Sequence, residues 1–388
     1  MKRNAVIYSY PFAVDIVVAL LLFVGRHSLA SRGMPESTVG SVLLFYGLGY
    51  CVSSLFMRHI VRPHLARWQM LAALGGLILS CCLLARIEQV WLILALFCLA
   101  PCAVSLFFNS FQSYMLGVAT EHARPLASTA GHYTFSWSLG YALGPFVSGA
   151  SRSFMAWSHI YYLAALISGF VAVLIVLSRP AGAATDQTDR PAPSERAPGE
   201  RSLIGAAWLG AVLGWMGWNA ISTYWPVQAA QLGYSAREKG VVEFAYSLAQ
   251  SLGALALVYA GRWHHRPLLL PALGAAGVLA LLVFAGAHTP AVFTIGAVLF
   301  GLYTASTFSF MVYHSMYDAD RAVKRVALNE TFVGLSFLAG PVAASLLHVE
   351  GQPFGPSYGV LALLLAAGIA VQTAYAHRLR GASPDQNK

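Results

Sequence analysis

A polar stretch at residues 179–202, RPAGAATDQTDRPAPSERAPGERS, divides the sequence into two halves that each contain six long apolar segments. Most of these segments approach or exceed the about 20 residues that a helix needs to cross roughly 30 Å of hydrocarbon. They are continuously apolar, whereas the strands of a membrane barrel would alternate apolar and polar residues. The sequence therefore predicts an all-α integral membrane protein with twelve spans in two six-helix bundles. We place the spans at 7–27, 38–58, 69–86, 90–115, 128–150, 155–178, 203–227, 240–260, 268–287, 291–314, 326–347 and 358–377.

The same pattern defines the domain organisation. We expect an N-terminal bundle at 1–178, a cytoplasmic linker at 179–202, and a C-terminal bundle with a short cytoplasmic tail at 203–388. Only 10% of the residues are charged, 57% are hydrophobic and the mean hydropathy is +0.63, which excludes a soluble globular protein. The linker is too short, and too rich in proline and charge, to fold as a nucleotide-binding domain.

Motifs of catalysis and metal binding are missing from the sequence. It contains no Gly-x-Ser-x-Gly elbow, no His-Glu-x-x-His pair and no glycine-rich phosphate loop. The five cysteines all lie inside predicted spans, and no pair of spans combines cysteine and histidine at zinc spacing. We therefore expect a protein that is not an enzyme and that needs no cofactor and no metal.

The positions of lysine and arginine predict the orientation, because cytoplasmic loops of membrane proteins carry an excess of both. With the N-terminus inside, 18 of the 24 lysines and arginines fall on the inner side. We expect a multi-pass protein of the plasma (inner) membrane with both termini in the cytoplasm. The net charge of +9 then reflects inner loops that face anionic lipid and gives no reason to expect a nucleic-acid partner. The outer side holds only Arg26, Arg32, Arg86, Arg152, Arg237 and Lys239.

The two halves contain an internal repeat. A shift of 196 residues aligns 113–145 with 309–341 without a gap, and it superimposes Gly144-Pro145 on Gly340-Pro341. Parallel repeats of six spans place a substrate site at the interface between the halves, near the middle of the bilayer. Glycine and proline let helices pack closely and bend. We therefore assign conformational roles to Gly140, Gly144, Pro145, Gly340 and Pro341.

The run Gly140-Tyr-Ala-Leu-Gly144-Pro145-Phe-Val-Ser-Gly149 resembles the antiporter motif of the major facilitator superfamily, and the resemblance covers essentially the whole chain. The loop at Met57–Arg67 departs from the family pattern, because it is basic but lacks the glycine and aspartate usual there. The span-four arginine typical of proton-coupled drug exporters is also missing. The resemblance implies a secondary transporter that works by alternating access as a monomer, with a small-molecule substrate and the lipid bilayer as its partners.

Several predicted spans carry polar or aromatic residues on one face at helical spacing. Amide side chains inside a membrane either join helices or contact a solute. Trp215 and Trp218 lie too deep for an interfacial belt, so we expect an aromatic wall that suits an amphipathic or aromatic solute, or a sugar stacked on a ring. Our candidates for cavity-lining residues are Asp15, Arg26, Asn109, Gln112, Trp215, Asn219, Ser222, Gln250, Tyr303 and Thr307.

Asp15 is the first candidate for binding a proton or a substrate cation, because an ionisable group inside a span is costly and indicates function. The alternative is a structural partner for a neighbouring helix dipole or hydroxyl. Arg26 lies near the outer end of the same span, where its side chain could also reach the interface.

Three further residues are candidates for proton coupling, each with a structural alternative. His132 could relay protons or donate to a backbone carbonyl. Glu243 could bind a proton or form a surface ion pair with Lys239, four residues before it. Glu330 could bind a proton or cap the start of span eleven.

These features predict a secondary active transporter that moves a small organic solute by alternating access. We expect coupling to protons and export as its direction. The alternatives are a facilitative uptake carrier for a sugar-like or aromatic metabolite, and a transport-inactive sensor or scaffold of the same fold.

Overall fold

The computed structural model describes residues 2–121, 126–178, 203–260, 263, 269–316, 321–349 and 351–381. Across these ranges the chain forms twelve α-helices and one short 3-10 helix, η1 (Pro63–Leu65), which confirms the all-helical prediction. The helices are α1 (Lys2–Ser31), α2 (Glu36–Ile60), α3 (Ala66–Leu84), α4 (Val90–Glu121), α5 (Leu126–Ser151), α6 (Trp157–Leu177), α7 (Ile204–Gln231), α8 (Ala236–Tyr259), α9 (Leu269–Ala285), α10 (Pro290–Met316), α11 (Ala322–Leu347) and α12 (Gly355–Gly381).

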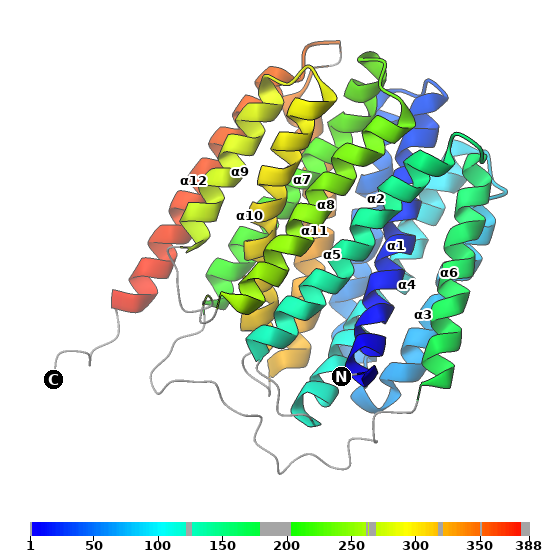
Figure 1. The fold of residues 1–388 in the computed structure, drawn as a ribbon, viewed down its shortest axis with the longest axis vertical. Helices are drawn as coiled ribbons and strands as arrows, with labels where there is room; N and C mark the ends of the chain where they lie inside the picture. Colours follow the sequence, from blue (N-terminus) through cyan, green and yellow to red (C-terminus); the bar gives the residue numbers. More distant parts are fainter. Residues whose placement is uncertain are drawn as a thin grey trace.

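The helices run roughly alongside one another, with α1–α6 grouped on one side and α7–α12 on the other (Figure 1). The start of α1 and the end of α12 lie at the same end of the molecule, which we name the terminal end; the opposite end is the distal end. The predicted linker at 179–202 lies outside the described residues. Its role as a cytoplasmic connection therefore remains a prediction.

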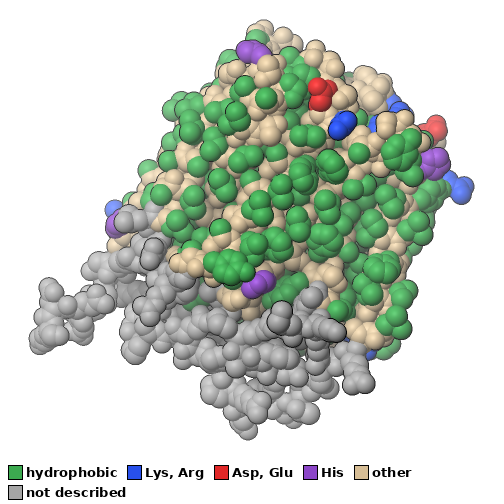
Figure 2. Space-filling model, viewed as in Figure 1, with side chains coloured by type: hydrophobic (Ala, Val, Ile, Leu, Met, Phe, Trp, Pro, Cys, Tyr) green, Lys and Arg blue, Asp and Glu red, His purple; other side chains and the backbone are tan. Residues whose placement is uncertain are grey.

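Ten of the described helices are long and apolar enough to cross a membrane. Helix α9 is apolar but only 17 residues long, and α5, which is rich in serine and glycine, is not among the ten. The face of the molecule in Figure 2 is covered by hydrophobic side chains, while most lysine, arginine and acidic side chains lie near its margins. Such a surface fits a hydrocarbon environment better than water.

The two groups of helices meet along two extensive contacts, α2 against α11 and α5 against α8. Glycines let the backbones approach closely at both contacts. A Cβ added to Gly47 of α2 would overlap the backbone at Phe337 and Leu338 of α11, and one added to Gly240 of α8 would lie 2.5 Å from the carbonyl oxygen of Pro145 in α5. These contacts hold the two groups close together around the residues that lie between them.

Packing inside each half follows the sequence repeat. A Cβ added to Gly144 of α5 would overlap Ala19 of α1, and one added to Gly340 of α11 would overlap Asn219 of α7. Helix α5 therefore packs on α1 as α11 packs on α7. Pro145 and Pro341 lie inside their helices, directly after these glycines.

Candidate functional site

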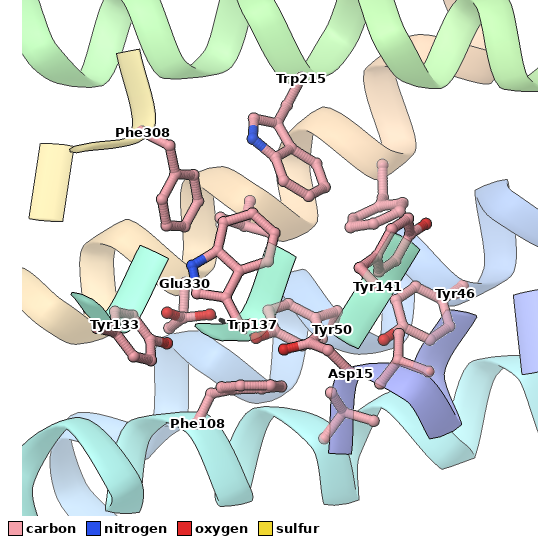
Figure 3. Close-up of a pocket in the computed structure, with 14 residues that line it drawn as sticks. Asp15, Tyr46, Tyr50, Phe108, Tyr133, Trp137, Tyr141, Trp215, Phe308 and Glu330 are labelled. Atoms are coloured by element: carbon pink, nitrogen blue, oxygen red, sulfur yellow. Dashed lines mark hydrogen bonds between the residues drawn. The ribbon is translucent and has the colours of Figure 1, made fainter. Parts of the chain in front are cut away.

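A small cavity of about 50 Å³ lies between the two groups of helices, near the middle of α1. Its lining is mostly aromatic, with two acidic side chains, Asp15 and Glu330, among the aromatic rings (Figure 3). Ligand pockets usually have volumes of about 300–1,000 Å³, so the cavity is closed in this conformation. The aromatic residues of the lining are Tyr46, Tyr50, Phe108, Tyr133, Trp137, Tyr141, Trp215, Phe308 and Phe337.

Glu330 belongs to α11 and bonds to the opposite group of helices. The hydroxyl of Tyr50 donates to its Oε2, and the side-chain amide of Gln112 donates to its Oε1 at 2.5 Å. The carboxyl group is 5% exposed and lies well inside α11, because that helix begins at Ala322 rather than at the predicted residue 326. The capping alternative is therefore wrong, since a capping residue lies at the first turn of its helix.

Asp15 belongs to α1 and enters the same cavity from the N-terminal half. It is 6% exposed, and its Oδ2 has no hydrogen-bond partner within the described part of the chain. No hydroxyl group of the described residues bonds to that oxygen, so the alternative in which a neighbouring hydroxyl holds this side chain has no support there. Among the described residues, the lining of this cavity includes no lysine, arginine or histidine.

Three aromatic rings from different helices meet at the cavity. Trp137 of α5 lies with its ring centre 5.7 Å from that of Trp215 in α7 and 4.5 Å from that of Phe308 in α10. Trp215 thus lies on the cavity wall. Because Trp137 comes from one half and its two partners from the other, separation of the halves would part these rings and enlarge the cavity.

Arg26 and Glu243 form a second polar cluster, nearer the distal end. Arg26 is 2% exposed and donates to Glu243 Oε2 at 2.9 Å and to the backbone carbonyl of Ser222 at 2.7 Å. His27 Nε2 lies 3.2 Å from Glu243 Oε1. The cluster joins α1 to α7 and α8. Arg26 is therefore held inside the protein and not at the membrane–water interface, and Glu243 is buried rather than paired at the surface with Lys239.

The remaining polar candidates are buried but do not line the central cavity. Asn109 donates to the carbonyl of Ser105 in its own helix, and Thr307 donates to that of Thr304. Tyr303 packs on Gly277 of α9. The Nδ2 of Asn219 and both amide atoms of Gln250 are buried without hydrogen-bond partners among the described residues.

His132 lies on α5, outside the lining of the cavity. Its Nδ1 is 2.7 Å from the carbonyl oxygen of Ser128, and its ring stacks on Tyr8 with 5.9 Å between ring centres. This is the geometry of the structural alternative, in which a ring N–H donates to the backbone carbonyl.

Most of the aromatic lining was not among the candidate residues predicted from the sequence. Tyr46 and Tyr50 are four residues apart on α2, and Tyr133, Trp137 and Tyr141 repeat every four residues on α5. A stripe of this spacing places its side chains on one face of a helix. The signal was therefore present, but the same spacing is usual on packed or lipid-facing helices.

No group of three or more histidine, cysteine or acidic side chains in the described ranges could hold a metal ion. The central site combines two carboxyl groups, their hydroxyl and amide donors, and aromatic rings. That set can bind and release protons and can contact a solute.

Comparison with known proteins identifies the family. Residues 11–341 match the model of the Major Facilitator Superfamily. The structure is similar to the human organic anion transporter MFSD10 (TETRAN), with a TM-score of 0.65 and 15% identity over 95% of this chain and 98% of that one. It is also similar to the nucleoside transporter NupG, with a TM-score of 0.61 and 13% identity over 98% and 99% of the two chains. A search of curated proteins finds no match. The chain belongs to the Major Facilitator Superfamily, a family of multi-pass membrane transporters of small solutes and not of enzymes.

Proposed function

We propose that the protein exchanges a small organic solute for protons at the central cavity, by alternating access. The observation that carries this proposal is the presence of two buried carboxyl groups, Asp15 of α1 and Glu330 of α11, in one aromatic cavity between the halves. Asp15, Glu330, Gln112 and Trp215 would line the path of the solute.

The physical reason is the cost of charge in an apolar environment. A carboxylate buried without a cation is costly to keep ionised, and a membrane interior makes that cost larger. A proton or a cationic group removes the cost. Because Asp15 and Glu330 come from different halves, neutralising them changes the balance between conformations that hold the halves together and conformations that part them.

The division of the chain supports the same mechanism. Residues 1–178 and 203–388 would act as two bodies that rock about the cavity, with 179–202 as a cytoplasmic linker. The terminal end would face the cytoplasm, which is supported by the excess of lysine and arginine predicted there. We propose the plasma (inner) membrane as the location and a monomer as the working unit.

Export is the proposed direction, and the antiporter-like run that contains Gly140, Gly144 and Pro145 supports it. In the other half, Gly340 and Pro341 occupy the equivalent position. These residues would hold α5 on α1 and α11 on α7 while the halves move as units. His132 and Glu243 would then contribute to packing and closure, and proton binding would rest with Asp15 and Glu330.

The test is a proton-flux assay on the purified full chain in liposomes that contain a pH-sensitive dye. A panel of organic cations, anions, nucleosides and sugars would be added to wild type, Asp15→Asn and Glu330→Gln. The matched control is Glu88→Gln, which removes an exposed carboxyl group outside the cavity. We expect solute-dependent proton movement in wild type and control, and its loss in both cavity variants.

Two other results of this assay would support the alternative functions. Solute flux without proton movement, unchanged in the two cavity variants, would contradict proton coupling and support the facilitative carrier. The absence of flux for every solute of the panel, in a protein that is folded and correctly inserted, would support the sensor or scaffold instead.

A further inference from the structure

We infer that the solute is a hydrophobic organic cation with an aromatic group, which the two carboxyl groups and the aromatic wall of the central cavity bind together. This inference rests on the proposed function and adds a substrate class to the same site. The first argument for a cation is the charge of the residues that line the cavity. Asp15 and Glu330 enter the cavity, and no basic side chain of the described residues lines it.

The two carboxyl groups differ in the number of hydrogen-bond donors around them. Glu330 accepts hydrogen bonds from Tyr50 and Gln112, so each of its oxygens has one donor. Asp15 Oδ2 is buried without a partner. A buried acceptor of this kind is costly to leave unpaired. Asp15 is thus the open position, where an ammonium group of the solute would supply both the missing donor and the missing charge.

The aromatic wall provides the second contribution. Tyr133, Trp137, Trp215 and Phe308 lie around the carboxyl groups (Figure 3). The face of an aromatic ring attracts a cation, and each such contact contributes about 0.5–2 kcal/mol depending on how far the cation is removed from water. The same rings bury the apolar part of the solute. A small cation without an apolar group would lack the favourable free energy of this apolar burial.

An organic anion does not fit this cavity. It would approach two carboxyl groups, and like charges at short range in an apolar environment repel strongly. The guanidinium group of Arg26 does not compensate, because it lies outside the cavity lining and is already bound by Glu243 and the carbonyl of Ser222. The solved transporter of organic anions shares the fold with this chain at 15% identity, and that likeness does not extend to the ligand.

The conformation described here is closed around the site. A cavity of about 50 Å³ is smaller than an aromatic cation requires. Trp137 and Phe308, whose ring centres lie 4.5 Å apart, come from opposite halves. Parting this contact enlarges the cavity without unfolding either half, so the solute enters in a conformation where the halves have rocked apart.

The test is a binding measurement by titration calorimetry on the full chain in detergent. The matched probes are tetraphenylphosphonium and tetraphenylborate, which have nearly the same size and shape and opposite charge; benzyltrimethylammonium and benzenesulfonate form a smaller pair. We expect both cations to bind and both anions to fail. Asp15→Asn and Glu330→Gln should each weaken cation binding by about tenfold or more, as expected for a lost charged contact.

Two further variants keep the result interpretable. Asp15→Glu retains the charge and should retain measurable binding, which separates a charge effect from a folding defect. Glu88→Gln removes an exposed carboxyl group outside the cavity and should leave binding unchanged. Size-exclusion profiles identify any variant that fails to fold.

Anions that bind as tightly as their cationic partners would overturn the inference, and so would cation binding that survives both cavity substitutions. Failure of wild type to bind either cation would overturn it as well. In each of these cases the proposed function stands if the liposome assay records proton-coupled flux of another solute.

Discussion

Arg26 Nη2 lies 2.9 Å from Glu243 Oε2, and this buried ion pair joins α1 to α8 across the interface between the halves. The two residues are 217 positions apart in the sequence. His27 and the carbonyl of Ser222 complete the cluster. Because α1 and α8 would move apart when the distal end opens, the cluster stabilises the conformation in which that end is closed.

We predict that Glu243→Gln shifts the protein toward a distal-open conformation. Removal of one partner leaves Arg26 as a buried charge without its counter-ion, which costs about 3–5 kcal/mol in comparable pairs. A change of 1.4 kcal/mol alters a conformational ratio about tenfold. The measurement is the distance distribution between spin labels at Ser31→Cys and Leu232→Cys, both exposed at the distal end, with the five native cysteines replaced.

The control for this experiment is Glu238→Gln, because Glu238 is an acidic residue five positions earlier on α8 that forms a capping box with Ser235 of its own helix. We expect its label distances to match those of the labelled parent. An unchanged distance distribution in Glu243→Gln would contradict the role of the ion pair in closing the distal end.

A second prediction concerns close packing inside the N-terminal half. A Cβ added to Gly140 would overlap the backbone carbonyl of Phe12, and a backbone atom cannot move aside as a flexible side chain can. Gly140→Ala should therefore destabilise the protein by about 1–3 kcal/mol, the usual cost of overpacking. The measurement is thermal unfolding in detergent, followed as a change in Tm.

Gly169→Ala on α6 is the matched control, because an added Cβ there meets no atom within 4 Å. Its Tm should equal or exceed that of the wild type, since alanine favours a helix over glycine by about 1 kcal/mol. Equal decreases in Tm for the two variants would mean that glycine at 140 is not required for the approach of α5 to α1.

The fold could be predicted from the sequence because its main determinant is local. Each apolar segment is long enough to span a bilayer alone, so the order of the helices follows without knowledge of their contacts. Most helix ends lie within a few residues of the prediction. The largest difference is at α4, which continues to Glu121 beyond the predicted residue 115, since a helix can extend past the apolar region into polar sequence.

The candidate site could be predicted only in part. Asp15 and Glu330 are conspicuous in sequence because acidic residues are rare in apolar segments. Their location in one cavity depends on how α1 and α11 pack, and that information is not local. Tyr50 and Trp137 were missed because an aromatic residue on a membrane helix has the same sequence signal whether it faces lipid, a neighbouring helix or a cavity.

A third prediction follows from the hydrogen bond between Tyr50 and Glu330. Each of Tyr50→Phe and Glu330→Leu should lower the Tm, and the double variant should lower it by less than the sum of the two. The reason is that both single changes remove the same bond, and coupled pairs in one network deviate from additivity by about 0.5–3 kcal/mol. Additive losses would mean that this bond contributes nothing to the stability of the closed conformation.

The last prediction tests whether the ring faces of the aromatic wall contribute to cation binding beyond the burial of apolar surface. Trp137→Leu keeps an apolar side chain at the cavity but removes the ring face. Tetraphenylphosphonium should then bind about 2–30-fold more weakly, which corresponds to the loss of one cation–π contact. The control is Trp91→Leu, because Trp91 is 68% exposed on α4 and does not line the cavity. Binding should be unchanged in the control, measured by the same titration calorimetry. If Trp137→Leu bound the cation as tightly as wild type, the carboxyl groups alone would account for recognition, and the wall would serve only to close the cavity.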